Sequence, residues 1–462
     1  MGTSSANVVI CGAGIAGVSA AYHLAVKHGV KDILLVDERS PLTLTSDKSS
    51  ECYRNWWPGP DNAMVSFMNR SIDLIENLAE ESDNYFHLNR RGYVFLTADP
   101  DRASAMKQMA EEISRLGAGP LRYHYGQDDD PDYPPAVPYG YDPQLTGADL
   151  VFDQTLIRRC FPFITDRAIA MIHVRRCGWL SAQQFGMYLL QQAKSSGVKF
   201  INGRITGVKT SAGQIETIHV DNASGPINLS TRTFVIAAGP LLRDVGAMVG
   251  IDFPVFNELH GKVAFNDTAG IISREAPLMI WQDPVAPYWS EDERRELESS
   301  EDTRWLLQEF PSGVHCRPEG GSGSQTILAL WTYDVEVHEP VFPPAFKDEY
   351  LEIVIRGLAR MIPGLIDSLE KLSRPVVDGG YYCKTRENRP LIGPLLPVKG
   401  AYVIGALSGF GIMAAMAAGE LLAKHVTGDG LPEYAPSFLL DRYEDPDYQK
   451  LLEKMQATSG QL

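Results

Sequence analysis

The stretch VVICGAGIAG at residues 8–17 decides the fold of this chain. Its apolar start predicts a buried strand, and its glycines predict a tight turn into a helix. This arrangement holds the pyrophosphate of a dinucleotide. A second apolar run, LLVD at 34–37, ends in a carboxylate that can accept hydrogen bonds from the hydroxyl pair of a ribose. The nucleotide contacts predicted here are Gly12, Ala13, Gly14, Ile15, Ala16, Gly17, Asp37, Glu38 and Arg39.

The three glycines of this stretch have separate expected roles. Gly12 permits the tight turn, Gly14 lets the backbone approach the pyrophosphate without a Cβ, and Gly17 lets the helix pack close to the strand. The start of the helix then offers N–H groups and a positive dipole end to the phosphates. An acid at Asp37, rather than a base, argues against a 2′-phosphate on the ribose.

A second segment near the end of the chain matches the first. YVIGALSGFGI at 402–412 predicts another apolar strand, a glycine turn and a helix of small residues. A nicotinamide enzyme needs only the first segment. The longer FAD lies across its domain and commonly uses both ends of the chain. The pair of segments therefore favours FAD over NAD(P).

Composition excludes several other classes of protein. The chain has 462 residues, with 42 basic and 58 acidic side chains and a net charge of −16, which disfavours nucleic acid or an anionic membrane as a partner. Six cysteines stand without a CxxC pair, so neither a disulfide framework nor a metal site is predicted. No apolar run reaches membrane-spanning length, and a first strand near residue 7 leaves no room for a secretory signal. We therefore expect a cytoplasmic protein.

The pattern of apolar residues predicts an α/β (α+β) protein with two domains. A Rossmann-type FAD-binding domain is expected from the separate segments 1–90, 150–250 and 375–462, and a mainly antiparallel β-sheet substrate domain from 91–149 and 251–374. A long loop is expected at 126–148 and a solvated acidic helix at 290–302, with other helices at 61–82, 101–117, 182–196 and 346–360 and a strand followed by a helix over 401–426.

Together these features resemble the FAD-dependent D-amino-acid oxidase/sarcosine oxidase-like superfamily, which includes glycine oxidase and dimethylglycine dehydrogenase. The resemblance also rests on GWL at 178–180, VIAAG at 235–239 and, most specifically, TRENRPLIGP at 385–394. It implies an FAD domain and a sheet domain that covers the flavin ring. Cys52 and Cys383 do not match a family attachment position, so non-covalent FAD is expected.

The resemblance also implies further contacts with FAD. Residues after the second strand would lie near the pyrophosphate and ribityl chain, the backbone of Ile205 would meet the adenine, and the second glycine turn would approach the pyrimidine edge of the flavin. A helix N-terminus there would stabilise the negative charge of reduced flavin. The implied contacts are Ser46, Lys48, Ser49, Ser50, Ile205, Ala238, Gly239, Gly409, Phe410, Gly411 and Ile412.

The chain departs from the sarcosine oxidases at the expected substrate site. Arg54 is retained, but Trp56 and Trp57 stand where a neighbouring basic residue is expected, and Met413 follows the second glycine turn in place of a lysine. The lysine and histidine of a sheet strand are also missing, since that stretch reads ILALW at 327–331. An aromatic pocket would suit a larger or more apolar amine through packing and cation–π contact. Its candidate lining is Trp56, Trp57, Tyr93, Trp281, Trp331 and Met413, each of which could equally be a core residue.

We therefore predict an enzyme that oxidises the C–N bond of an amine or amino-acid-like substrate by hydride transfer to flavin N5, with oxygen or another electron acceptor. The candidate catalytic residues are Arg54, His260, Lys262 and His315. Two alternatives stay open, namely oxidation of a 2-hydroxy acid and a flavin-carrying subunit of a heteromeric dehydrogenase. An oligomer is possible.

Overall fold

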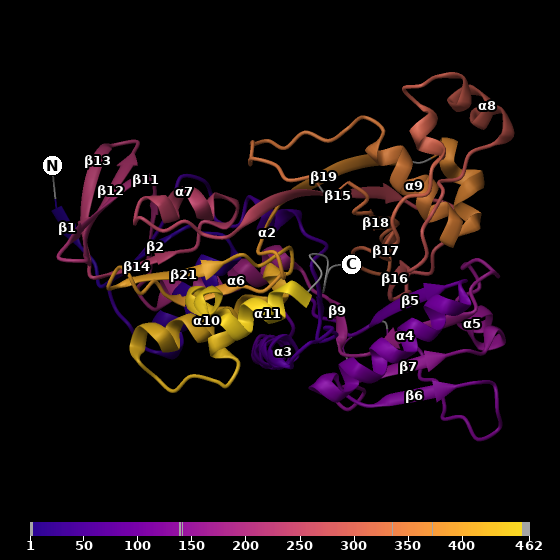
Figure 1. Ribbon diagram of the computed structural model, residues 1–462, viewed down its shortest axis with the longest axis horizontal. Coiled ribbons are helices and arrows are strands. Elements are labelled where there is room, and N and C mark those ends of the chain that lie inside the picture. Colours follow the sequence, from indigo (N-terminus) through magenta and orange to yellow (C-terminus); the bar gives the residue numbers. More distant parts are fainter. Residues whose placement is uncertain (1–2, 138–139, 141, 335, 372, 455–462) are drawn as a thin grey trace.

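The computed structural model describes residues 3–137, 140, 142–334, 336–371 and 373–454. Figure 1 shows two parts side by side, with the N-terminal segment and the C-terminal helices in the left-hand part and a larger sheet in the right-hand part. Two long strands, β15 (Phe256–Asn266) and β19 (Ser373–Lys384), run from one part to the other (Figure 1).

The left-hand part is built on a six-stranded sheet with the strand order β10-β3-β2-β14-β21-β20. Five strands are parallel, and the edge strand β20 is antiparallel. This order places the first and last glycine turns of the chain on either side of β14, at the carboxyl ends of the strands. The strands are β2 (Val8–Cys11), β3 (Ile33–Asp37), β10 (Lys199–Asn202), β14 (Thr233–Ile236), β20 (Leu391–Pro394) and β21 (Ala401–Gly405).

Both faces of this sheet are covered, which explains its nearly continuous apolar strands. Val8 and Ile10 pack into the core formed with four helices, whereas Val9 and Cys11 face a second core formed with a four-stranded sheet and α7. The helices are α1 (Ile15–Tyr22), α3 (Ala63–Glu81), α6 (Ala182–Ser195) and α10 (Gly411–Thr427), with α7 at Leu242–Ala247. The small sheet consists of β1 (Thr3–Ser5), β11 (Arg204–Ser211), β12 (Gln214–Asn222) and β13 (Gly225–Ser230).

The right-hand part is a nine-stranded sheet with the order β19-β15-β18-β17-β16-β5-β8-β7-β6. Six of its neighbouring pairs are antiparallel and two, β16–β5 and β6–β7, are parallel. Its other strands are β5 (Tyr93–Thr97), β6 (Leu121–His124), β7 (Ala148–Val151), β8 (Ala170–Val174), β16 (Leu278–Trp281), β17 (His315–Pro318) and β18 (Thr326–Leu330). A separate pair joins β4 (Cys52–Arg54) to β9 (Cys177–Trp179).

The remaining helices lie mostly around the nine-stranded sheet (Figure 1). The acidic helix begins after a capping box in which Ser290 and Glu293 bond reciprocally, and none of its side chains is buried. These helices are α2 (Thr45–Lys48), α4 (Pro100–Ile113), α5 (Gln154–Cys160), α8 (Glu291–Ser299), α9 (Tyr350–Met361) and α11 (Pro446–Lys454). Short π or 3₁₀ segments are His23–Lys27, Ser114–Ala118, Gly239–Leu241, Arg304–Leu307, Pro363–Lys371, Ala435–Phe438 and Leu440–Glu444.

The structure confirms the predicted fold class and the strand–helix–strand unit at the start of the chain. The predicted division into domains differs from the sheets in two places. The division gave residues 150–250 and 375–462 to the FAD-binding domain, but β8 and most of β19 belong to the nine-stranded sheet. The reason is their pairing, since β8 pairs with β5 and β19 pairs with β15.

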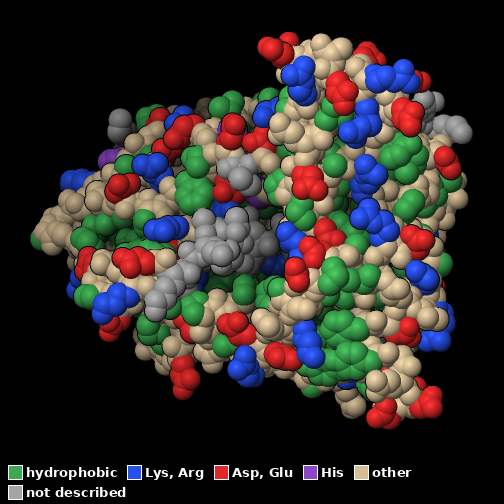
Figure 2. All heavy atoms as spheres, turned by 45° about the vertical axis from the view of Figure 1, so that its right-hand side comes forward, with side chains coloured by type: hydrophobic (Ala, Val, Ile, Leu, Met, Phe, Trp, Pro, Cys, Tyr) green, Lys and Arg blue, Asp and Glu red, His purple; other side chains and the backbone are tan. Residues whose placement is uncertain are grey.

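On the face shown in Figure 2, the acidic side chains do not gather in one area. Figure 2 shows acidic and basic side chains interspersed over the face that it presents. Within the described part of the chain, no helix is both long enough and apolar enough to cross a membrane. In the same residues, no cluster of three His, Cys, Asp or Glu side chains could hold a metal ion.

Candidate active site

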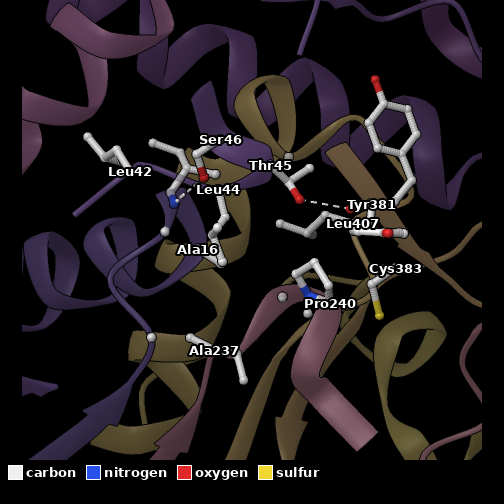
Figure 3. A pocket seen from close by; sticks show the side chains of 18 of the residues that line it. Ala16, Leu42, Leu44, Thr45, Ser46, Ala237, Pro240, Tyr381, Cys383 and Leu407 are labelled. Carbon is white, nitrogen blue, oxygen red and sulfur yellow. Dashed lines mark hydrogen bonds between the residues drawn. The ribbon is translucent and has the colours of Figure 1, made fainter. Parts of the chain in front are cut away.

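An open pocket, the first cavity, lies at the carboxyl ends of β2, β3, β14 and β21 and contains about 860 Å³ of empty space, including the solvent at its mouth. Its walls therefore come from the loops that follow these strands, together with α2 and the carboxyl end of β19. The lining includes most of the predicted cofactor contacts, namely Gly12, Gly14, Ile15, Ala16, Asp37, Arg39, Ser46, Ser49, Ala238, Gly239, Gly409, Gly411 and Ile412. Leu42, Leu44, Thr45, Pro240, Tyr381 and Cys383 also line it (Figure 3).

Two glycines of the first turn have different roles. One is required by the backbone conformation of the turn, and the other leaves space in the cavity. Gly12 has a φ of +105°, and a Cβ there would lie 2.3 Å from the carbonyl oxygen of Ala237. The turn can therefore form only with glycine. Gly14 has an ordinary φ of −70°, and a Cβ there would meet only Ser46 Oγ at 3.3 Å. Its missing side chain leaves the cavity open rather than permitting the turn.

Polar groups surround the start of α1 (Figure 3). Ser46 Oγ accepts a hydrogen bond from the backbone N–H of Ile15 at 2.9 Å, so this hydroxyl lies at the helix N-terminus. Asp37 Oδ2 accepts one from the N–H of Ala13 at 2.7 Å. Burial raises the pKa of Asp37, although the bonded N–H groups of Ala13 and Arg39 oppose this shift. Anionic and polar ligands are stabilised in such surroundings.

The second glycine turn brings the start of α10 to the same cavity. Ala406 and Ser408 have positive φ values of 53° and 44°, and Gly409 follows at 83°. Positive φ in non-glycine residues costs about 1–3 kcal/mol and is concentrated at functional sites. A Cβ on Gly409 would lie 2.2 Å from the ring of Tyr382, so this glycine lets the ring lie against the turn.

A second cavity adjoins the first and contains about 660 Å³ of empty space, including the solvent at its mouth. Ser49, Tyr382, Ser408, Gly409 and Ile412 line both cavities, so the two spaces meet at the loop after α2 and at the second glycine turn. The remaining lining of the second cavity is Ser50, Glu51, Cys52, Arg54, Tyr93, His260, Gly261, His315, Leu330, Thr332, Phe410 and Met413.

One wall of the second cavity carries a buried cation and a buried phenol. The Arg54 side chain lies over the Trp57 ring at 4.7 Å and is 5% exposed. Tyr93 is fully buried, and its hydroxyl lies beside the Cys52 thiol with no nitrogen or oxygen hydrogen-bond partner among the described residues. Burial holds the pKa of Tyr93 well above its ordinary value, so the hydroxyl remains a donor. Unsatisfied buried donors are rare, and a bound ligand would provide the missing acceptor.

Two histidines in the second cavity are held neutral. His315 Nδ1–H donates to the carbonyl oxygen of Gly313 at 2.8 Å, which leaves Nε2 as the acceptor. Burial lowers the pKa of His315 to about 4. Burial also lowers the pKa of His260, although the neighbouring carboxylate of Glu258 opposes the shift. At neutral pH both rings are therefore uncharged, and each has one ring nitrogen that can act as a hydrogen-bond acceptor.

Unlike these two histidines, Lys262 does not line the second cavity. Its Nζ donates to the carbonyl oxygens of Asp47 at 3.4 Å and Ser49 at 3.1 Å. Arg317, which is fully buried, donates to the carbonyl oxygen of Ser50 at 2.8 Å. Lys262 is outside the cavity lining and, with Arg317, holds the loop that separates the two cavities.

The structure brings only some of the predicted aromatic residues to the cavity. Tyr93 and Met413 line it, and Trp57 lies behind it, edge-on to Phe410 with ring centroids 4.8 Å apart. Trp56, Trp281 and Trp331 are buried in the hydrophobic cores and lie outside the lining of both cavities. Trp331 also donates its indole N–H to the carbonyl oxygen of Pro311 at 2.9 Å.

Several predicted cofactor contacts lie beside the first cavity rather than on its surface. Gly17, Ala13, Glu38, Lys48 and Ile205 are outside its lining, and Ser50 and Phe410 line only the second cavity. Lys48 instead forms ion pairs with Asp47 and Asp378. Ile205 belongs to β11 and packs into the core between the six-stranded and the four-stranded sheets.

The predicted site residues do not include seven residues of the second cavity, namely Glu51, Cys52, Gly261, Leu330, Thr332, Tyr382 and Ser408. Thr332 is one residue beyond the ILALW stretch, on the same face as Leu330 by the period of two along a strand. Tyr382 comes three residues before the specific TRENRPLIGP segment. Thr332 and Tyr382 are therefore both next to segments that the sequence analysis had identified.

The fold and the first cavity define a dinucleotide-binding oxidoreductase in which both ends of the chain line the site. Residues 7–425 match the model of the FAD dependent oxidoreductase family, DAO, so the chain belongs to this family. FAD is accordingly its cofactor, as the resemblance predicted. The glycine-lined cavity and the two helix starts fit a pyrophosphate and a long flavin nucleotide.

The chain is similar to several known proteins. It is 24% identical over 426 residues to mitochondrial dimethylglycine dehydrogenase of Rattus norvegicus, and this alignment covers 90% of the chain but 42% of that relative. The fold is similar to that of L-proline dehydrogenase from P. horikoshii, with a TM-score of 0.72, 20% identity and coverage of 96% and 98%. It is also similar to glycine oxidase from Geobacillus kaustophilus, with a TM-score of 0.71, 14% identity and coverage of 95% and 99%.

Proposed function

We propose that the protein oxidises the C–N bond of an amine that carries a carboxylate, in the second cavity, with FAD in the first. The observation that carries this proposal is the shared wall, since Ser49, Tyr382, Ser408, Gly409 and Ile412 line both spaces. A substrate in the second cavity would therefore lie against whatever part of the cofactor reaches this wall. The relatives named for dimethylglycine, proline and glycine support an amine of this kind.

Arg54 and Tyr93 are the proposed carboxylate ligands. A buried guanidinium forms strong charge-assisted hydrogen bonds with a carboxylate, and the Tyr93 hydroxyl can donate one more. Trp57 supports this pair by packing against Arg54 and Phe410. The apolar part of the substrate would contact Phe410, Met413 and Leu330. We therefore propose a substrate that carries one carboxylate and is bulkier than sarcosine, because the pocket offers one arginine and several apolar walls.

The remaining requirement is a neutral amine nitrogen, because an ammonium group has no lone pair to stabilise the developing iminium. FAD, when bound, supplies the hydride acceptor. The neutral rings of His260 and His315 are the proposed proton acceptors in the cavity. Exclusion of water by the buried walls also favours the uncharged form of the amine.

The proposed attachment of FAD is non-covalent. Burial raises the pKa of Cys383, which lines the first cavity, to about 12, and it also raises the pKa of Cys52 in the second cavity. Thiols in such surroundings remain protonated and are poor nucleophiles. Acid precipitation should therefore release intact FAD into the supernatant, whereas flavin that stays with the precipitated protein would contradict this proposal.

The test of the proposed function is an anaerobic stopped-flow screen of flavin bleaching. The panel contains N-methylated glycines, cyclic and branched amino acids, larger secondary amines, and the matching 2-hydroxy acids. The proposal predicts that a carboxylate-bearing amine larger than sarcosine reduces the flavin fastest. Faster reduction by any 2-hydroxy acid, or no reduction by any amine, would refute it.

A further inference from the structure

A buried charged network lies directly behind the second cavity. Glu258 and His260 stand two residues apart on β15 and therefore share one face of the strand. Lys384, at the end of the neighbouring strand β19, donates to Glu258 Oε2 at 2.7 Å. His260 Nε2 lies 3.1 Å from the same oxygen, and His260 Nδ1 lies 3.2 Å from Thr332 Oγ1. Of these four residues, His260 and Thr332 line the cavity, whereas Glu258 and Lys384 are buried behind them.

The donors and acceptors of this network fix the tautomer of His260. Burial alone would raise the pKa of Glu258, but the hydrogen bonds from His260 and Lys384 bring it below its ordinary value. Glu258 is therefore an ionised acceptor, and His260 must carry its proton on Nε2 to donate to it. Nδ1 is then the acceptor, so the Thr332 hydroxyl donates its hydrogen to the ring. The lone pairs of Thr332 Oγ1 are thus left for a donor in the cavity.

We propose that Thr332 and His260 form a relay that takes the proton of the substrate ammonium, with Glu258 and Lys384 as positioning residues. This inference rests on the proposed function. The ammonium N–H transfers its proton to Thr332 Oγ1 as the Thr332 hydroxyl proton moves to His260 Nδ1. The amine becomes neutral, Thr332 is unchanged, and His260 becomes an imidazolium whose Nε2–H remains bonded to the Glu258 carboxylate. No electrons move in this step.

Glu258 and Lys384 have opposite effects on the charge of the His260 ring. Glu258 stabilises the imidazolium once it forms, whereas the cation of Lys384 disfavours a charged ring before substrate arrives. The Tyr382 ring stacks on His260, with centroids 4.0 Å apart and planes at 15°, and fixes the plane of the imidazole. The groups that face His260 are therefore Glu258, Lys384, Tyr382 and Thr332, with His315 on β17 as the other titratable group nearby.

The first test compares Thr332→Val and Thr332→Ser by anaerobic flavin reduction across pH, using the best amine of the screen. At pH 7 we expect reduction by Thr332→Val to be about 100-fold slower, which is the lower range for loss of a general base, with little change in apparent substrate affinity. Its rate should approach that of the wild type above about pH 10, where the amine is neutral in solution. Thr332→Ser should restore most of the loss at pH 7.

A charge-paired variant tests the positioning residues. Glu258→Gln with Lys384→Met removes both buried charges together, so neither is left without its partner. We expect its reduction rate to fall at pH 7 while the FAD content stays that of the wild type. Glu275→Gln is the matched control, because Glu275 is an exposed carboxylate of the same sheet domain. Wild-type rates at pH 7 in Thr332→Val, or an equal loss at every pH, would overturn the relay.

A second measurement does not depend on turnover. In ¹⁵N-histidine-labelled holoenzyme, the signal absent from His260→Phe should show a neutral ring protonated on Nε2 at pH 7. A ring protonated on Nδ1, or a cationic ring, would overturn the network even if an amine reduces the flavin. If no amine reduces the wild-type flavin, the proposed function fails and the relay fails with it. If amines do reduce it and Thr332→Val is unaffected, only the relay fails.

Discussion

The two cavities of this protein are built in different ways. The first is shaped largely by backbone, because glycine turns and helix starts at the ends of four strands provide its walls. The second is shaped by side chains from β4, β5, β15, β17, β19 and the start of α10. Contiguous motifs therefore determine the first cavity, the proposed cofactor site, whereas the second cavity, the proposed substrate site, depends on how distant strands are placed. A backbone site keeps its chemistry through large changes of sequence, and a side-chain site can change its substrate one residue at a time.

The largest expected effect is a loss of FAD affinity in a variant that keeps the fold. Gly14→Val should lower FAD affinity by more than about 100-fold, or about 2.8 kcal/mol, because the new side chain would enter the cavity at the start of α1. The fold should survive, since a Cβ there meets only the Ser46 hydroxyl. FAD titration and circular dichroism measure the two outcomes.

The matched control is Gly321→Val, because a Cβ at Gly321 has no atom within 4 Å and its φ is not positive. It should bind FAD as tightly as the wild type. Unchanged FAD affinity in Gly14→Val would show that the first cavity does not hold the cofactor.

Acid should destabilise both parts of the molecule through buried histidines. Burial lowers the pKa of His23, beside α1, to about 3 and that of His315, in the second cavity, to about 4. Both values lie below about 6.5 in the unfolded chain, so the unfolded chain binds more protons in the window between. Stability is therefore complete above about pH 6.5 and falls as the pH decreases through that window.

Each of these two histidines should cost about 2 kcal/mol at pH 5 relative to pH 7. Urea unfolding at the two pH values measures the loss. His315→Phe should reduce the pH dependence, and His28→Gln, at a half-buried histidine near the end of the first helical segment, is the control. Equal stability at pH 7 and pH 5 would contradict the neutral buried state of both rings.

Arg54→Ala should raise KM for the substrate about 10–150-fold, since loss of a charge-assisted hydrogen bond costs about 1.5–3 kcal/mol. FAD content should be unchanged, because Arg54 lines only the second cavity. Anaerobic flavin reduction at increasing substrate concentration measures the change. The exposed Arg243 provides the control variant Arg243→Ala. An unchanged KM would remove Arg54 from the carboxylate site.

Tyr93→Phe should have the smallest effect, an approximately 2–13-fold rise in KM, because it removes one hydrogen bond of about 0.5–1.5 kcal/mol. The same variant should lose little stability, since the hydroxyl has no nitrogen or oxygen partner among the described residues and only the weakly accepting Cys52 thiol beside it. Thermal unfolding without substrate checks this second point. A large loss of stability with an unchanged KM would mean that the hydroxyl serves the fold instead.

The sequence predicted the cofactor site more fully than the substrate site for a physical reason. Gly12, Gly14 and Asp37 lie in local turns and at strand ends, so their positions can be predicted from their spacing along the chain. Trp331 and Thr332 show the opposite case. They are neighbours on opposite faces, and Trp331 packs on Gly357 in the core while Thr332 reaches the cavity. Sequence alone could not tell which face would meet the cofactor.

Lys262 and Trp57 lie close to the second cavity, as predicted, but neither lines it. Both lie within a few ångströms of cavity residues, yet Lys262 binds backbone carbonyls of the loop at Ser49 and Trp57 supports Arg54 from behind. Their residue types suggested direct contact with substrate. Their actual positions depend on the register of β15 and on the packing of α10, which no local pattern contains.

The most direct test of this account is a crystal structure of the holoenzyme with a non-oxidisable thioether carboxylate. The account predicts the flavin ring at the wall formed by Ser49, Tyr382, Ser408, Gly409 and Ile412, with the inhibitor carboxylate within hydrogen-bond distance of Arg54 and Tyr93. A flavin ring away from this wall, or an inhibitor bound outside the second cavity, would contradict it.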